Sequence, residues 1–271
     1  MPDLVAEPEA HLKERQLGSM SLLQHLEELR KRIIYSLAAV AVGFGVCWYF
    51  AKDYIYPVME KPILVVFKKY NIDPHLSYLS PTDPFNLYLK VGLLAGIFVA
   101  SPIILYQVWN FISPGLYRNE KRFVLPFLFL SVGLFLAGGF FGYRIVFPVA
   151  MDFLIGAYGG DFRANITIDE YTKLFLTIIL GLALIFELPI VLGFAGMMGV
   201  VNAKFLFKHI RGAVLIFFII AAILTPTTDI MNMTIYAAPM ILLYILSIGI
   251  VWLVHPKQRR KRREKRERES R

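Results

Sequence analysis

Apolar runs long enough to cross a lipid bilayer recur along nearly the whole chain, and they restrict its fold more than any other feature. Hydrophobic residues make up 57% of the sequence and charged residues 18%, which is unusual for a soluble domain. A helix needs about 20 mostly apolar residues to cross the hydrocarbon core. The runs predict membrane spans at residues 33–50, 88–112, 123–147, 174–198, 212–224 and 235–254. We therefore expect an all-α integral membrane protein.

The distribution of Lys and Arg favours a six-transmembrane-helix bundle with both termini in the cytoplasm (N-in/C-in). Residues 212–224 would cover only about 20 Å of a core about 30 Å thick, so this run alone leaves the number of spans open. Basic residues gather before the first span, in the links 113–122 and 199–211, and in the tail after His255, which holds ten. Five spans would place that tail outside, against the positive-inside rule.

The chain divides into three parts by composition. Residues 1–20 are polar, mixed in charge and without the apolar core of a cleavable signal peptide, so we expect a disordered lead. Residues 21–254 form the membrane domain, and residues 255–271 form a basic cytoplasmic tail. A basic tail directly after a span is typical of an anchor at the anionic lipid surface, and we expect no nucleic-acid partner.

The sequence contains no pattern that predicts a cofactor, a metal site or covalent catalysis. Cys47 is the only cysteine and lies in the first span, and the five histidines are scattered without metal-ligand spacing. There is neither a Gly-rich phosphate loop nor a nucleophile elbow. We therefore expect a protein that is not an enzyme.

Glu187 is a lone carboxylate near the middle of the apolar run 174–198. A charged side chain at that depth costs about 2.5–3.5 kcal/mol on insertion scales. Pro189, two residues later, removes a backbone donor and weakens the helix beside the acid. Two interpretations stay open: a structural Glu that is protonated or internally bonded, and a functional intramembrane polar site.

Two further carboxylates lie in segments expected on the cytoplasmic side. One is Glu27 or Glu28, in an amphipathic helix that starts near Ser21, lies on or just below the membrane and runs into the first span; the other is Glu120, in the link 113–122. Carboxylates bind guanidinium groups through paired, charge-assisted hydrogen bonds, so an arginine ligand is expected. Alternatively, Glu28 forms an ordinary helix pair with Arg32 and Glu120 neutralises its basic neighbours.

The outer side has two notable segments. Residues 51–87 form a proline-containing loop, within which residues 62–70 predict a short interfacial helix that caps a cavity or forms a docking surface. The link with Thr225, Pro226 and Asp229 joins the fifth and sixth spans. Because Pro239 would shorten the straight part of the sixth helix, we expect the fifth and sixth helices both to be short. Two consequences stay open: the short helices thin the bilayer locally, or neighbouring spans cover the mismatch in length.

The polar motifs of the chain, taken in order, resemble those of the TatC family, the polytopic subunit of the twin-arginine (Sec-independent) protein translocase. The matching segments are HLEELRKR at 25–32, PIILYQVW at 102–109, SPGLY at 113–117 with Glu120, FELP at 186–189, and TP at 225–226 with Asp229. The resemblance runs from about residue 21 to residue 254. Several separate motifs in the same order make it specific.

This resemblance implies a receptor that binds twin-arginine signal peptides of folded proteins in the bacterial cytoplasmic (inner) membrane. It implies that Glu120 and Glu28 bind the arginine pair, with recognition residues at Arg30, Phe111 and Tyr117. Glu187 would face a concave bundle surface near the signal peptide. The fifth and sixth helices, with Thr225, Pro226 and Asp229, would dock the single-span partners TatA and TatB. Self-association and lipid contacts are also implied, and the proton-motive force would supply the energy.

The sequence departs from the family pattern at two positions. Asp83 stands where many relatives carry Glu, and Ile245 stands where many carry an acid, so no role of that acid passes to this chain. From the residues alone, an ion-coupled transporter that uses Glu187 and a passive scaffold for other membrane helices are the rival functions.

Overall fold

The computed structural model describes residues 22–112, 124–158, 165–225 and 229–254. The described elements, in chain order, are α2 (Leu22–Tyr49), η1 (Ala51–Ile55), α3 (Tyr56–Lys69), α4 (Asp83–Ile112), α5 (Val124–Phe141), η4 (Gly142–Val146), α6 (Phe147–Tyr158), α7 (Ile168–Ile185), α8 (Leu188–Met197), α9 (Ala203–Lys208), α10 (Ile210–Leu224) and α11 (Ile230–Val254). The elements η1 and η4 are single π-helical turns. The expectation of an all-helical membrane protein is confirmed.

Five helical segments of the described residues are long and apolar enough to cross a membrane: Leu23–Tyr49, Asp83–Ile112, Leu125–Gly156, Ile168–Met197 and Met233–Leu253. They correspond to the first, second, third, fourth and sixth predicted spans. The fifth, α10, has 15 residues, which is about 22 Å of helix. The short fifth helix is thus confirmed, whereas a count of six membrane crossings stays a prediction.

The expected short sixth helix is wrong. The helix α11 continues through Pro239 for 25 residues, which is about 37 Å. A proline inside a helix removes one backbone hydrogen bond. The helix can still continue when the residues around the proline are packed against neighbouring helices. Here Tyr236, Ala237 and Met240 around the proline are all fully buried in the bundle.

The segment before the first span is helical and runs into that span, as predicted. It continues directly into the span as one helix, α2, without a break near the membrane surface. This segment is therefore an extension of the first span, in line with it.

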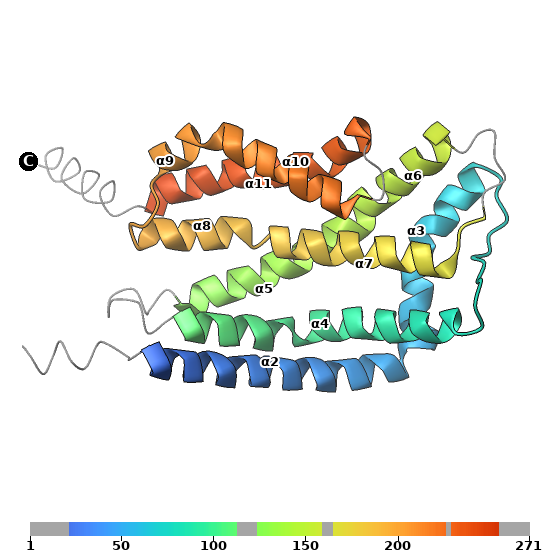
Figure 1. Ribbon diagram of the computed structural model, residues 1–271, viewed down its shortest axis with the longest axis horizontal. Coiled ribbons are helices and arrows are strands. Elements are labelled where there is room, and N and C mark those ends of the chain that lie inside the picture. Colours follow the sequence, from blue (N-terminus) through green and yellow to red (C-terminus); the bar gives the residue numbers. More distant parts are fainter. Residues whose placement is uncertain (1–21, 113–123, 159–164, 226–228, 255–271) are drawn as a thin grey trace, which may run out of the picture.

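The helices run roughly side by side in Figure 1, with α5 and its continuation α6 crossing them diagonally. The start of α2, the end of α4, the short helix α9 and the end of α11 lie at one end of the bundle, and α3 lies across α2 and α4 at the other. We call these the α9 end and the α3 end. The expected cytoplasmic segments adjoin the α9 end.

The helices α2 and α4 pack closely because glycines face each other along their contact. A Cβ atom added to Gly96 of α4 would lie 2.6 Å from the backbone nitrogen of Phe44, and one added to Gly43 would lie 2.7 Å from the carbonyl oxygen of Gly96. Small residues allow helix backbones to approach in a membrane. This contact sets the register of α2 against α4.

The helix predicted in the loop 51–87 is present as α3, but it starts earlier and contains Pro62; its position at the membrane interface stays a prediction. Pro62 lacks the N–H that would bond to the carbonyl of Val58. The Tyr143 hydroxyl donates to that carbonyl instead, at 2.7 Å. The buried Tyr171 hydroxyl likewise donates to the Met59 carbonyl at 2.6 Å. One face of α3 is thus fastened to the bundle.

Replacing Gly96 with Ala is expected to lower the thermal unfolding temperature of the detergent-purified protein. The added methyl group would overlap the α2 backbone, and overpacking of this kind costs about 1–3 kcal/mol. Gly45→Ala is the matched control, because a Cβ there meets nothing within 4 Å and Ala favours a helix by about 1 kcal/mol over Gly. Equal unfolding temperatures for the two variants would contradict a packing role for Gly96.

Candidate functional site

Glu28 lies near the start of α2 at the α9 end of the bundle, and only one of its two carboxylate oxygens accepts a hydrogen bond from the described residues. Arg32, one turn further along α2, donates to its Oε1 at 3.2 Å. The other oxygen, Oε2, is buried and accepts no hydrogen bond from the described residues. The side chains of Glu28 and Arg32 are 19% and 28% exposed, respectively. An unpaired buried acceptor costs about 1–3 kcal/mol, so it calls for an explanation.

Arg32 holds this carboxylate in place by contacting a second helix. Its Nη1 donates to Oε1 of Gln107 on α4 at 2.9 Å, while its Nη2 bonds to Glu28. The planar guanidinium group can make both contacts at once because its donors point in fixed, different directions. The expected Glu28–Arg32 helix pair is therefore present, and it belongs to a bridge between α2 and α4.

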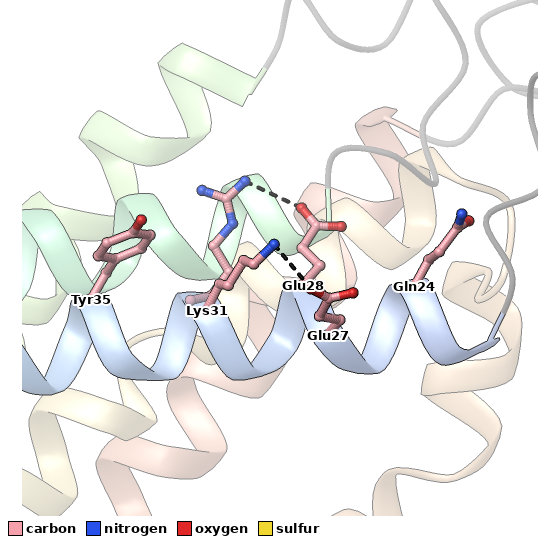
Figure 2. Close-up of a pocket in the computed structure, with 6 residues that line it drawn as sticks. Gln24, Glu27, Glu28, Lys31 and Tyr35 are labelled. Atoms are coloured by element: carbon pink, nitrogen blue, oxygen red, sulfur yellow. Dashed lines mark hydrogen bonds and ion pairs between the residues drawn. The ribbon is translucent and has the colours of Figure 1, made fainter.

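A hollow of about 550 Å³ lies along the same face of α2. Figure 2 shows the side chains that line it, which rise from successive turns: Gln24, Glu27, Glu28, Lys31, Arg32 and Tyr35. Glu27 pairs with Lys31 at 3.2 Å, but its side chain is 65% exposed. The hollow thus combines one sheltered carboxylate, Glu28, with a solvated ion pair.

The other residues expected at this site have different positions. Phe111, near the end of α4, stacks on His25 of α2 with ring centroids 4.3 Å apart. Arg30 is exposed and is not among the residues that line the hollow. Glu120 and Tyr117 lie outside the described residues, so their placement beside Glu28 stays a prediction.

Glu187 lies in the turn between α7 and α8, where the fourth span is interrupted. Pro189 falls in the first turn of α8, where its missing N–H costs little; the predicted weakening of the helix beside the acid is therefore observed. The buried hydroxyl of Ser131 on α5 donates to Glu187 Oε2. The other oxygen, Oε1, is buried and has no hydrogen-bond partner among the described residues.

The residues of the outer link are placed in part. Thr225 is buried, and its N–H caps α10 by bonding to the Ala221 carbonyl at 2.8 Å. Asp229 lies just before α11 and accepts from the N–H of Met233 through its backbone carbonyl. Pro226 lies outside the described residues.

Gln107 and Ser131 are the residues that the sequence-based site prediction missed. Gln107 lies 75 positions from Arg32, so no local spacing links them, although it belongs to a motif that carries the resemblance. Ser131 is a polar residue in the apolar run 123–147, and a search for polar side chains inside predicted spans would have found it.

Comparison with known proteins agrees with the motif-based resemblance. The family model of the Sec-independent protein translocase protein TatC matches residues 24–239. The TatC protein of Koribacter versatilis is 56% identical over 269 residues, covering 98% of both chains. That of Aquifex aeolicus is 39% identical over 231 residues, covering 84% of this chain and 93% of the relative.

A solved structure supports the same conclusion. A crystal structure of the twin-arginine translocase receptor TatC superimposes with a TM-score of 0.76 at 37% sequence identity, covering 85% of this chain and 99% of that one. These relatives are transport components and do not form an enzyme family. The match supports neither of the two rival functions, the ion-coupled transporter and the passive scaffold. The chain therefore belongs to the TatC family and is a multi-pass membrane component of the twin-arginine translocase.

Proposed function

We propose that the chain is the receptor for twin-arginine signal peptides within this translocase, and that Glu28 is a direct ligand of the arginine pair. The observation that carries the proposal is the buried, unpaired Oε2 of Glu28 beside the hollow. An incoming guanidinium group would supply the missing donor. It would also replace water in a partly sheltered site, where charge-assisted hydrogen bonds are stronger than in bulk water.

The same geometry gives a reason to prefer arginine over lysine. Oε1 of Glu28 is already bonded to Arg32, so a ligand reaches this carboxylate mainly through Oε2. A guanidinium group can bond to Oε2 and direct its other N–H groups to a second acceptor, which we propose is Glu120. The ammonium group of lysine is a point charge without this fixed fork of donors.

This mechanism requires the α9 end to face the cytoplasm, so we propose that both termini lie there and that the protein resides in the bacterial inner membrane. The apolar stretch of the signal peptide would then extend toward Glu187. Support for this second contact comes from the interrupted helix and from the unpaired Oε1 of Glu187. Ser131 would keep the carboxylate oriented when the site is empty.

We further propose that the single-span partners TatA and TatB dock along α10 and α11, near the outer link. One stripe of α10 supports this proposal, because it exposes large apolar side chains at helical spacing: Leu215, Ile216, Ile219 and Ile223. Binding of a signal peptide would rearrange these partners, and the proton-motive force would drive the transport of folded cargo.

Glu28→Gln is expected to weaken binding of a labelled twin-arginine peptide to the detergent-purified chain about tenfold or more, because a hydrogen bond to a charged group contributes about 1.5–3 kcal/mol. A peptide with both arginines changed to lysine should bind the wild-type chain more weakly. Glu120→Gln should resemble Glu28→Gln.

The matched control is Glu170→Gln, which removes an exposed carboxylate at the α3 end. It should leave peptide binding unchanged. Equal binding of the arginine and lysine peptides, with no effect of Glu28→Gln in a variant that still unfolds at the wild-type temperature, would rule out this role for Glu28.

Arg32→Lys is expected to lower the preference for the arginine peptide over the lysine peptide several-fold, without changing the net charge. A lysine ammonium lacks the fixed fork that reaches both Glu28 and Gln107, so the Glu28 carboxylate would lose its orientation. The readout is the ratio of the two dissociation constants. An unchanged ratio would mean that Arg32 only supports the contact between α2 and α4.

Adding one helical turn to the apolar part of α10 is expected to reduce export of a folded reporter. Such an insertion would bring the helix to about 28 Å, close to the thickness of the hydrocarbon core, and would remove the mismatch that we propose thins the bilayer. Because α11 is long, this proposal now depends on α10 alone. Normal export with normal peptide binding would disprove thinning by α10.

A further inference from the structure

Two hollows lie next to each other toward the α3 end of the bundle, and both are lined in part by α3 and Tyr143. The first, of about 260 Å³, is almost entirely apolar and lies between α3, α4, α5 and α7. Its lining includes Val58, Ala95, Phe98 and Phe140. The second, of about 240 Å³, is lined by Lys61, Pro62, Val65, Tyr143, Arg144 and Pro148. An apolar hollow thus adjoins a cationic one.

The two cations of the second hollow have no acidic partner among the described residues. Lys61 and Arg144 are both exposed and line the same space, yet the lysine salt bridges on this side of the molecule join other residues, Lys69 with Asp152 and Lys90 with Asp169. Cations are not needed here for membrane orientation, since the positive-inside rule concentrates Lys and Arg on the opposite side.

Arg144 lies about 20 residues beyond the start of α5, which is about 30 Å of helix and close to the thickness of the hydrocarbon core. Because α5 crosses the bundle diagonally (Figure 1), this length covers somewhat less than the full thickness of that core. A long cationic side chain at this depth extends toward the lipid headgroups. We therefore expect the charged groups of the second hollow to reach the level of the lipid phosphates.

Tyr143 joins the two hollows into one feature. Its ring lines both spaces, while its hydroxyl is bonded to the Val58 carbonyl. A molecule with a negative headgroup and an apolar chain could place the headgroup at Lys61 and Arg144 and lay the chain past Tyr143 against Phe98 and Phe140. A phospholipid combines these properties.

From this juxtaposition we infer that the chain binds one anionic phospholipid, with its phosphate between Lys61 and Arg144 and an acyl chain in the apolar hollow. The inference does not depend on the proposed signal-peptide site, which lies at the opposite end of the bundle. A zwitterionic lipid carries a compensating positive group, so it gains less from the two cations.

Native mass spectrometry of the detergent-purified full chain, titrated with phosphatidylglycerol or phosphatidylcholine of identical acyl chains, tests the inference. We expect one phosphatidylglycerol to be retained in preference to phosphatidylcholine. The double variant Lys61→Gln/Arg144→Gln should weaken phosphatidylglycerol binding about fivefold for each cation removed. Equal retention of the two lipids by the wild-type chain would overturn the inference.

Lys68→Gln is the matched control, since Lys68 is exposed on the same helix but does not line either hollow. It should leave phosphatidylglycerol binding unchanged; a loss equal to that of the double variant would show only general charge attraction and overturn the site.

Ala95→Phe tests the apolar half, because the larger ring would fill the hollow. We expect it to reduce retention of phosphatidylglycerol strongly while the unfolding temperature, measured without added lipid, stays within a few degrees of wild type. Undiminished retention in a folded variant would exclude the chain site. If the double variant kept its lipid but lost a co-expressed single-span helix, the hollows would form a protein site and the lipid proposal would be wrong.

Discussion

A proline inside a helix leaves the carbonyl four residues earlier without its usual donor, and that carbonyl needs another donor wherever water is scarce. Two such carbonyls in this protein are those of Val58 and Phe98, each four residues before a proline. The Tyr143 hydroxyl donates to the first and the Ser101 hydroxyl to the second, both at 2.7 Å. The first bond fastens α3 to the bundle, and the second lets α4 continue as one helix. The arrangement of the α3 end depends on the first of these substitute bonds.

The two carboxylates of interest share one property. Glu28 and Glu187 each accept one hydrogen bond, from Arg32 and Ser131 respectively, and each keeps a buried oxygen without a partner among the described residues. One bonded oxygen fixes the direction of the group, and the other remains available. A fully paired carboxylate would be more stable but would have to break a bond before it could bind a ligand.

Local patterns in the sequence predicted much of this structure. Apolar length located the spans, the spacing of Glu28 and Arg32 predicted their pair, and Pro189 located the break beside Glu187. The features that the sequence analysis did not predict depend on packing between distant segments. The continuation of α11 through Pro239 needs the burial of its neighbours, and the contact of Arg32 with Gln107 needs the register of α2 against α4. Neither can be read from the spacing of residues along one helix.

The glycine contact between α2 and α4 has a consequence for how such chains can change in evolution. Because Gly43 and Gly96 hold the two backbones together, the direction of Glu28 is set by the number of residues between it and Gly43. One inserted residue in that stretch would turn the acidic motif by about 100° around the helix axis and carry Arg32 away from Gln107. We therefore expect the length of this segment to be constrained separately from its composition, so that relatives differ there by substitutions on the lipid-facing side and not by insertions or deletions.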